Sequence, residues 1–290
     1  MTSSASTNRF SDYKRSVVLV VLAGLFLSTS GIAVRSLEQA TSMQIVFYRS
    51  VGLAIFMLLV VWYRNRGRLQ QTLTSTGRLG IVAGLLYAGA SLAVIFALVN
   101  TTVANAMFII SLAPFFAAIG GWLFLRERVS ARTWIALFIA ICGVLIMIEG
   151  GVSTKGLTGI TYALIMAICY GGFSVCIRAG RDRDMLPTIA LSGLVLALFA
   201  GFAADSLLPS THDIIICLGM GVLQTGLGGL CLTIGAQHIP AAQITLLAML
   251  EVVLNPVWVW LGVGETPGIY SLVGGALIVS AIAYQALSKP

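Results

Sequence analysis

The stretch Trp122-Leu-Phe-Leu-Arg-Glu127 returns as Trp260-Leu-Gly-Val-Gly-Glu265, at a spacing of 138 residues (122 to 260). The match continues upstream at the same spacing, so that residues 97–127 correspond to residues 235–265. Near the start of each half, Val34-Arg35 falls on Ile177-Arg178 at the similar spacing of 143. A correspondence of this length and order indicates that one structural unit has been duplicated.

The composition shows which solvent surrounds this unit. Apolar residues make up 58% of the 290 residues, charged residues make up 9%, and the mean hydropathy is +0.99. A soluble domain normally has about 25% charged residues, so lipid must surround most of this chain. Ten continuous apolar segments have roughly the length needed to cross a bilayer as helices: residues 16–35, 43–63, 78–98, 103–125, 132–149, 156–177, 187–206, 212–235, 241–262 and 268–287.

These segments divide between the two copies. The sequence predicts an all-α integral membrane protein of ten transmembrane helices, arranged as two inverted five-helix repeats around a central cavity. We expect a cytoplasmic N-terminal tail over residues 1–15, a first repeat over 16–149 and a second over 156–287. Because five is an odd number, the second copy starts from the opposite side of the membrane. Inverted repeats of this kind are typical of secondary transporters.

The basic residues predict the orientation of the helices. With the N-terminus inside, only Arg35 and Lys155 fall in outside loops, while Arg49 lies within a span and the other basic residues lie inside. Cytoplasmic loops normally hold such an excess of Lys and Arg. We therefore expect a multi-pass protein of the bacterial inner membrane with both termini in the cytoplasm. This placement also explains the net charge of +7 without nucleic acid as a partner.

Three features together resemble the drug/metabolite transporter superfamily, EamA type. They are the paired Trp-Leu-x-x-x-Glu ends, Pro114 in the stretch Ile110-Ser-Leu-Ala-Pro114, and the stretch Leu250-Glu-Val-Val-Leu-Asn-Pro256-Val-Trp-Val-Trp260. Within that superfamily the chain looks most similar to the YddG-type bacterial amino-acid exporters. The resemblance implies a basket of ten helices with a central cavity, and amino acids as substrates, with aromatic ones among the candidates.

Glu251 is the most distinctive polar residue, because it lies midway along an apolar segment. A carboxylate at the centre of a bilayer costs about 2.5–3.5 kcal/mol on insertion scales. It therefore binds a substrate or a proton, or it is neutral and makes a hydrogen bond to another helix. Asn255 and Trp258 follow four and seven residues later and share its helix face. Together the three offer a carboxyl, an amide and an aromatic ring to a substrate.

Two prolines are candidate hinges. Pro114 and Pro256 each remove a backbone donor and free a carbonyl within a predicted span. The two prolines do not occupy equivalent positions in the two copies, because Val252 is the residue that corresponds to Pro114. Each proline either allows the two repeats to move against one another or produces a static kink.

Other polar and aromatic residues lie within the spans and are unfavourable in contact with lipid. They line the cavity or join helices to one another: Ser30, Tyr87, Ser91, Asn105, Phe108, Tyr170 and Gln224. Arg49 has three interpretations. Its side chain extends to the membrane surface, pairs with an acidic residue, or contacts a substrate carboxylate.

The function that these observations favour is export of amino acids or similar small metabolites by alternating access. The alternatives are export of other metabolites or drugs on the same fold, or a channel-like facilitator. An enzyme is not expected, because His212 and His238 fall at opposite faces and no catalytic or metal-binding motif occurs. The five cysteines lie within apolar segments as core residues. We expect no cofactor and no obligate protein partner.

Overall fold

The computed structural model describes residues 3–64, 77–126, 131–149, 154–180, 184–235 and 241–286. These residues form helices without strands. Glu127, His238 and six of the basic residues used for orientation (Arg66, Arg68, Arg128, Arg181, Arg183 and Lys289) lie outside the described residues. The helices are α1 (Ser3–Leu27), α2 (Ser30–Arg35), α3 (Ser42–Arg64), α5 (Gly77–Asn100), α6 (Val103–Ile110), α7 (Ala113–Leu125), α8 (Ala131–Glu149), α9 (Thr154–Ala179), α10 (Leu186–Ala203), α11 (Thr211–Gly219), the π-helix η1 (Met220–Leu227), α12 (Gly228–Gly235), α13 (Ala241–Val263) and α14 (Ile269–Ala286).

Seven segments within the described residues are long and apolar enough to cross a membrane. They are Lys14–Arg35, Ser42–Arg64, Gly77–Asn100, Val103–Leu125, Gly156–Ala179, Leu186–Ala203 and Thr211–Gly235. Shorter apolar helices cover Trp134–Ile146, Leu250–Val263 and Ile269–Ala281. The protein is therefore helical and membrane-embedded. The helix boundaries agree with the expected segments to within a few residues, except that α1 begins at Ser3 and includes most of the expected tail.

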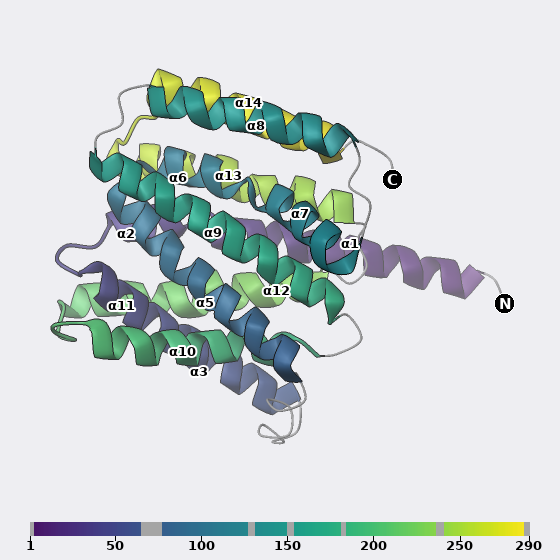
Figure 1. The fold of residues 1–290 in the computed structure, drawn as a ribbon. Helices are drawn as coiled ribbons and strands as arrows, with labels where there is room; N and C mark the ends of the chain where they lie inside the picture. The colour runs from purple at the N-terminus through teal and green to yellow at the C-terminus, as the bar shows by residue number, and fades with distance from the viewer. Residues whose placement is uncertain are drawn as a thin grey trace.

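The helices pack in three layers (Figure 1). The pair α8 and α14 forms one edge of the bundle, and α3, α10 and α11 form the opposite edge, with α5, α6, α9 and α13 between them. The start of α1 and the end of α14 lie at the same end of the bundle. The other end holds the loops after α2, α5, α10 and α13, and we name it the Arg35 end.

The helix contacts join the two halves of the chain. Helix α3 packs on α10, α8 on α14, and α6 on α13. In addition, α5 packs on α9 and α1 packs on α12, while α7 contacts α9 and α1 contacts α13. Each contact therefore crosses from the first half of the sequence to the second. The two halves are thus interleaved rather than separate.

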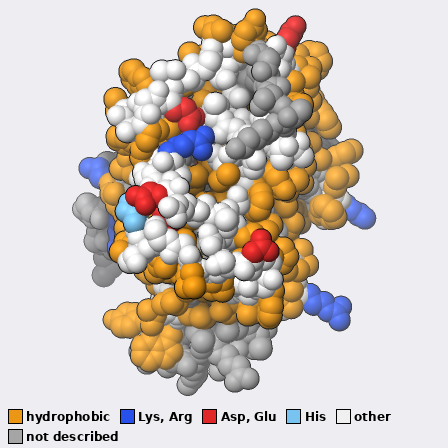
Figure 2. Space-filling model, turned by 90° about the vertical axis from the view of Figure 1, so that its left-hand side faces the viewer, with side chains coloured by type: hydrophobic (Ala, Val, Ile, Leu, Met, Phe, Trp, Pro, Cys, Tyr) orange, Lys and Arg blue, Asp and Glu red, His pale blue; other side chains and the backbone are white. Residues whose placement is uncertain are grey.

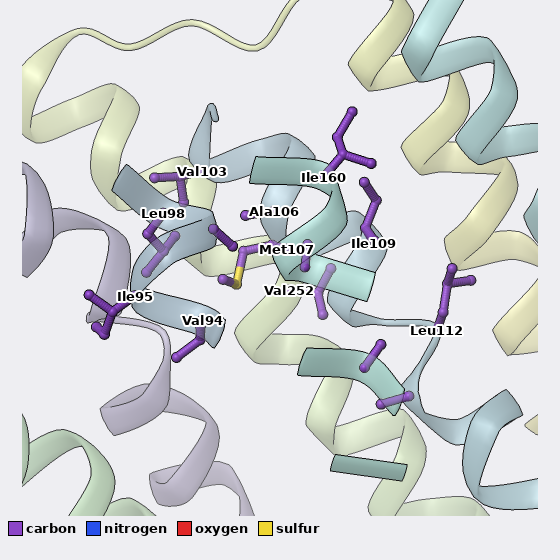
Figure 3. Packing of buried hydrophobic residues seen from close by; sticks show 14 of the residues in the cluster. Val94, Ile95, Leu98, Val103, Ala106, Met107, Ile109, Leu112, Ile160 and Val252 are labelled. Atoms are coloured by element: carbon purple, nitrogen blue, oxygen red, sulfur yellow. The ribbon is translucent and has the colours of Figure 1, made fainter. Parts of the chain in front are cut away.

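Small residues allow these helices to approach closely, as is typical where lipid supplies no hydrophobic driving force. A Cβ atom on Gly143 would lie 2.6 Å from the Gly274 carbonyl, between α8 and α14. A Cβ on Gly171 of α9 would lie 3.0 Å from the Ala113 carbonyl of α7. Between these contacts, aliphatic side chains from α5, α6, α9 and α13 fill the interior, with Met107 and Val252 at the centre of the packing (Figure 3).

The Arg35 end differs in surface character from the sides of the bundle. Figure 2 shows acidic, basic and histidine side chains on this end among backbone and small polar groups, with hydrophobic side chains around its margin. Large exposed apolar residues on the sides include Val18, Leu59, Leu85 and Phe138. An apolar belt between polar ends is the surface that a bilayer requires.

Candidate functional site

Four polar side chains from four different helices lie close together in the middle of the bundle. Arg49 of α3 interacts electrostatically with Tyr87 of α5 and Glu251 of α13, and Tyr170 of α9 interacts with both Tyr87 and Glu251. We name these four residues the central cluster. Tyr87, Tyr170 and Glu251 are each half-buried, whereas Arg49 is only 6% exposed.

Aromatic rings form one wall of the central cluster. The ring centroids of Tyr87 and Tyr170 are 6.5 Å apart, and Phe173 lies 4.8 Å from Tyr87 and 5.9 Å from Tyr170. All three rings come from the α5–α9 contact. Such tilted arrangements are favourable between aromatic rings and present flat apolar surface with two hydroxyl groups. The cluster therefore combines a carboxyl group, a guanidinium and an aromatic surface.

Arg49 does not extend to the surface. Its Nη1 atom donates to the Ser91 hydroxyl at 2.8 Å and to the Ser91 carbonyl at 3.2 Å. Ser91 is therefore the positioning residue for the guanidinium. Glu251 lies near enough for its charge to interact with Arg49, yet the two side chains make no ion pair within 4.0 Å among the described residues. The carboxyl and the guanidinium are therefore near one another without forming an ion pair.

A second group of predicted residues surrounds the break between α1 and α2. Asn255 of α13 is fully buried, and its Oδ1 accepts the Gly31 N–H at 2.7 Å while its Nδ2 donates to the Ser30 hydroxyl at 2.7 Å. Trp258 donates from Nε1 to the Ser28 hydroxyl at 2.9 Å. These contacts satisfy polar groups that the end of α1 and start of α2 would otherwise leave unpaired. We name Ser28, Ser30, Asn255 and Trp258 the break junction.

Gln224 contacts the end of α1, next to the break junction. It lies in η1, is 4% exposed, and its Nε2 donates to the Leu27 carbonyl at the end of α1, at 3.5 Å. Its Oε1 has no partner within the described part of the chain. The π-helix was not expected from the sequence. Short π segments within α-helices occur frequently at functional sites.

Asn105 and Phe108 face a different neighbour. The Asn105 Oδ1 accepts the Ser271 hydroxyl of α14 at 2.5 Å, and the Phe108 ring lies against Gly275 of the same helix. These two residues therefore join α6 to α14. The structure thus places the sequence candidates in three groups. Glu251, Tyr87, Tyr170 and Ser91 lie at or beside the central cluster; Ser30, Asn255 and Trp258 lie at the break junction; and Asn105 and Phe108 lie against α14.

The two prolines occupy different settings. Helix α6 ends at Ile110 and α7 begins at Ala113, so Pro114 lies in the first turn of α7, where its missing N–H leaves no bond unmade. Pro256 lies inside the continuous helix α13. The helical segment around Pro114 is therefore interrupted between α6 and α7, whereas α13 is continuous through Pro256.

The sequence matches the model of one family in each half. Residues 14–149 and 157–285 match the EamA-like transporter family. The chain belongs to this family. It is a multi-pass membrane transporter, and its relatives are named as transporters rather than enzymes.

Named relatives of this EamA-like transporter differ in what they transport. It is 26% identical over 278 residues to the pseudopaline exporter CntI of Pseudomonas aeruginosa, which covers 92% of this chain and 94% of the relative. It is 29% identical over 185 residues to the riboflavin transporter of Rhizobium johnstonii, covering 61% of this chain and 59% of the relative. A solved structure shares the fold with a TM-score of 0.67 at 15% identity, covering 93% of this chain and 96% of that chain.

Proposed function

We propose that this transporter exports amino acids, or similar small zwitterions, across the bacterial inner membrane by alternating access. In this proposal, ten transmembrane helices form two inverted repeats, over residues 16–149 and 156–287, around a central cavity. The Arg35 end faces outward and both termini are cytoplasmic. The relevant relatives are the YddG-type exporters, with aromatic amino acids among the candidate substrates.

The helix contacts support the inverted repeat. If the first five spans are exchanged with the last five in order, the contacts of α3 with α10, α6 with α13, and α8 with α14 map onto themselves. The contact of α5 with α9 maps onto that of α12 with α1, and the contact of α7 with α9 maps onto that of α13 with α1. The start of α1 and the end of α14 at one end of the bundle agree with an even number of crossings (Figure 1).

The central cluster is the observation on which the substrate class rests. An ionisable residue within a membrane span is expensive and normally marks a substrate or ion pathway. Here a glutamic acid and an arginine from opposite halves of the chain lie near one another without forming an ion pair, beside two tyrosines. A molecule with an ammonium group and a carboxylate offers each residue a partner of opposite charge: the ammonium for Glu251 and the carboxylate for Arg49. Small metabolites are also what the pseudopaline exporter and the riboflavin transporter are named for.

The uneven proline settings suggest where movement takes place. The interruption at Ser111 and Leu112 replaces regular helical hydrogen bonds, since the Ser111 hydroxyl donates to the Phe108 carbonyl at 2.6 Å. We propose that Pro114 in this interrupted segment and Pro256 in α13 act as the hinges. Hinges of this kind absorb backbone rotation while the packed helices move as rigid bodies.

Transport in proteoliposomes tests the proposal directly. The purified protein is reconstituted, and efflux of each radiolabelled L-amino acid is measured with and without unlabelled competitor. We expect efflux that is saturable and that is reduced by competitors. Unlabelled substrate on the opposite side should accelerate efflux, because a carrier returns faster when it is loaded. Empty liposomes and the exposed-loop variant Glu38→Gln serve as controls. Absence of saturable, competed flux for every amino acid would contradict the substrate class, and flux without acceleration would favour a channel-like facilitator.

A further inference from the structure

Arg49 is a buried cation whose donors are only partly used. A guanidinium has five N–H donors and no acceptor. The described partners of Arg49 are the hydroxyl and carbonyl of one residue, Ser91, and both are bound through Nη1. Its Nε has no partner in the described part of the chain. Burial of a charged group without full pairing is costly. A group of this kind therefore indicates a role other than stabilising the fold.

The position of Arg49 is fixed by its backbone as well as by Ser91. A Cβ atom on Gly221 of η1 would overlap the Arg49 carbonyl, and one on Gly52 would lie 2.7 Å from the Leu218 carbonyl. Helix α3 and the segment 218–221 are therefore in backbone contact at the level of Arg49. This contact fixes the backbone of Arg49, and the two hydrogen bonds to Ser91 fix its guanidinium.

The groups that face Arg49 come from three other elements. Tyr87 projects from α5, Cys217 from α11 and Glu251 from α13, and only Glu251 is a carboxylic acid. Glu251 makes no ion pair with Arg49. A carboxylate supplied by a ligand would give the free donors the planar, two-point acceptor that a guanidinium fits best.

We propose that Arg49 binds the carboxylate of the transported substrate and thereby selects molecules that have one. This assignment rests on the proposed function and deepens it, because it makes the carboxylate, rather than the side chain of the amino acid, the required group. Glu251 then faces the ammonium group of the same molecule. The tyrosine rings of the central cluster then lie beside the side chain of the substrate.

The test compares an amino acid with its own amide, which keeps the ammonium group and lacks the carboxylate. The first pair is L-phenylalanine and L-phenylalaninamide; if another amino acid gives the highest flux, it and its amide replace them. For the unaltered protein, we expect the amide to inhibit efflux at least about tenfold more weakly than the acid, since a charge-assisted two-point contact is lost. Arg49→Gln is expected to lower efflux of the acid by about tenfold or more and to bring the two inhibitors within about twofold of each other.

Matched variants separate binding from folding. Arg64→Gln removes an exposed arginine from the last turn of the same helix and should change neither flux nor discrimination. Arg49→Lys keeps the charge with a single-point geometry, and it is the deciding variant if Arg49→Gln is not monodisperse. For Arg49→Lys we expect reduced discrimination between acid and amide, because an ammonium does not reproduce the guanidinium fork.

Three results would overturn the assignment. One is unchanged discrimination in both Arg49 variants. Another is an equal loss for acid and amide, which would indicate a general disturbance of the site. The third is recovery of flux in the double variant Arg49→Gln with Glu251→Gln, because recovery means that Arg49 only compensates the charge of Glu251. If the unaltered protein transports no amino acid, the proposed function fails first, and this assignment fails with it.

Discussion

Within the described residues, two arginine–glutamate pairs join the halves of the chain, and they are built in opposite ways. At the Arg35 end, the Arg35 Nε donates to Glu265 at 2.6 Å, and its two Nη atoms donate to the Leu98 and Thr101 carbonyls. The second Glu265 oxygen accepts the Val103 N–H at 2.8 Å. In the middle of the bundle, Arg49 and Glu251 lie near enough for their charges to interact but form no ion pair.

The difference is the reverse of what stability alone requires. The Arg35–Glu265 side chains remain 23% and 22% exposed, where an unpaired charge would cost little. The deeper pair is the one left apart, where the cost of an unpaired charge is greatest. Proteins depart from local optimum chiefly at functional sites. The comparison therefore assigns the first pair to structure and supports a ligand-binding role for the second.

The largest effect is expected at the deep pair. Glu251→Gln keeps the shape of the side chain and removes the charge that the proposed substrate ammonium contacts. We expect efflux in proteoliposomes to fall by about tenfold or more, as for loss of a charge-assisted contact. The variant should elute as the unaltered protein does on size-exclusion chromatography. Full flux at every pH tested would remove Glu251 from the transport mechanism.

A carboxylate that is satisfied without an arginine sharpens the comparison. Asp213 is fully buried and accepts the backbone N–H groups of Glu38, Gln39 and Ala40 at 3.0, 3.0 and 2.9 Å. Asp213→Asn replaces one acceptor by a donor that faces an N–H. We expect a loss of about 2–4 kcal/mol of stability in thermal unfolding of the detergent-solubilised protein. A loss below that of the exposed-loop control Asp205→Asn would show that these hydrogen bonds contribute little.

The smallest effect is expected at the Arg35 end. Glu265→Gln keeps one oxygen as the acceptor for the Val103 N–H and places an amide donor opposite the Arg35 Nε–H, so the charge-assisted bond to Arg35 is lost. We expect about 1–2 kcal/mol of destabilisation, because the pair is partly exposed to solvent. The acid-to-amide discrimination should stay as in the unaltered protein. Arg35→Gln combined with Glu265→Gln should cost less than the sum of the two single changes. A change in discrimination would mean that the two pairs do not have separate roles.

Much of the fold was predictable because lipid imposes a simple rule on sequence. A span must be apolar over a fixed length, so most helix boundaries in the structure agree with the segments read from hydropathy. The prolines alone did not predict which span is interrupted, because the chain breaks between α6 and α7 near Pro114 and continues as one helix through Pro256. The π-helix η1 was not predictable either, because it depends on how Gly221 and Gly226 meet α3 rather than on a local pattern.

Three members of the central cluster were candidates from the sequence, whereas the grouping of the candidates was not predictable. Glu251, Tyr87 and Tyr170 were identified because polar side chains within a span are costly in contact with lipid and normally mark a functional site. Helical spacing alone places Asn255 with Glu251, yet the structure pairs Asn255 with Ser30, which lies 225 residues away. For Arg49, three interpretations remained open in the sequence. Only its position against Ser91 excludes an extended side chain that reaches the surface.

The contacts of Asp213 have a practical consequence for mapping which side of the membrane each loop occupies. Insertion of an epitope or a reporter enzyme between Glu38 and Ala40 would displace the three amides from the carboxylate. The neighbouring loop is no better, because the Ser206 and Leu207 carbonyls accept hydrogen bonds from Gln44 and Tyr48. Accessibility should therefore be measured at this end with single cysteine labels on exposed side chains such as Leu208, which leave both loops intact.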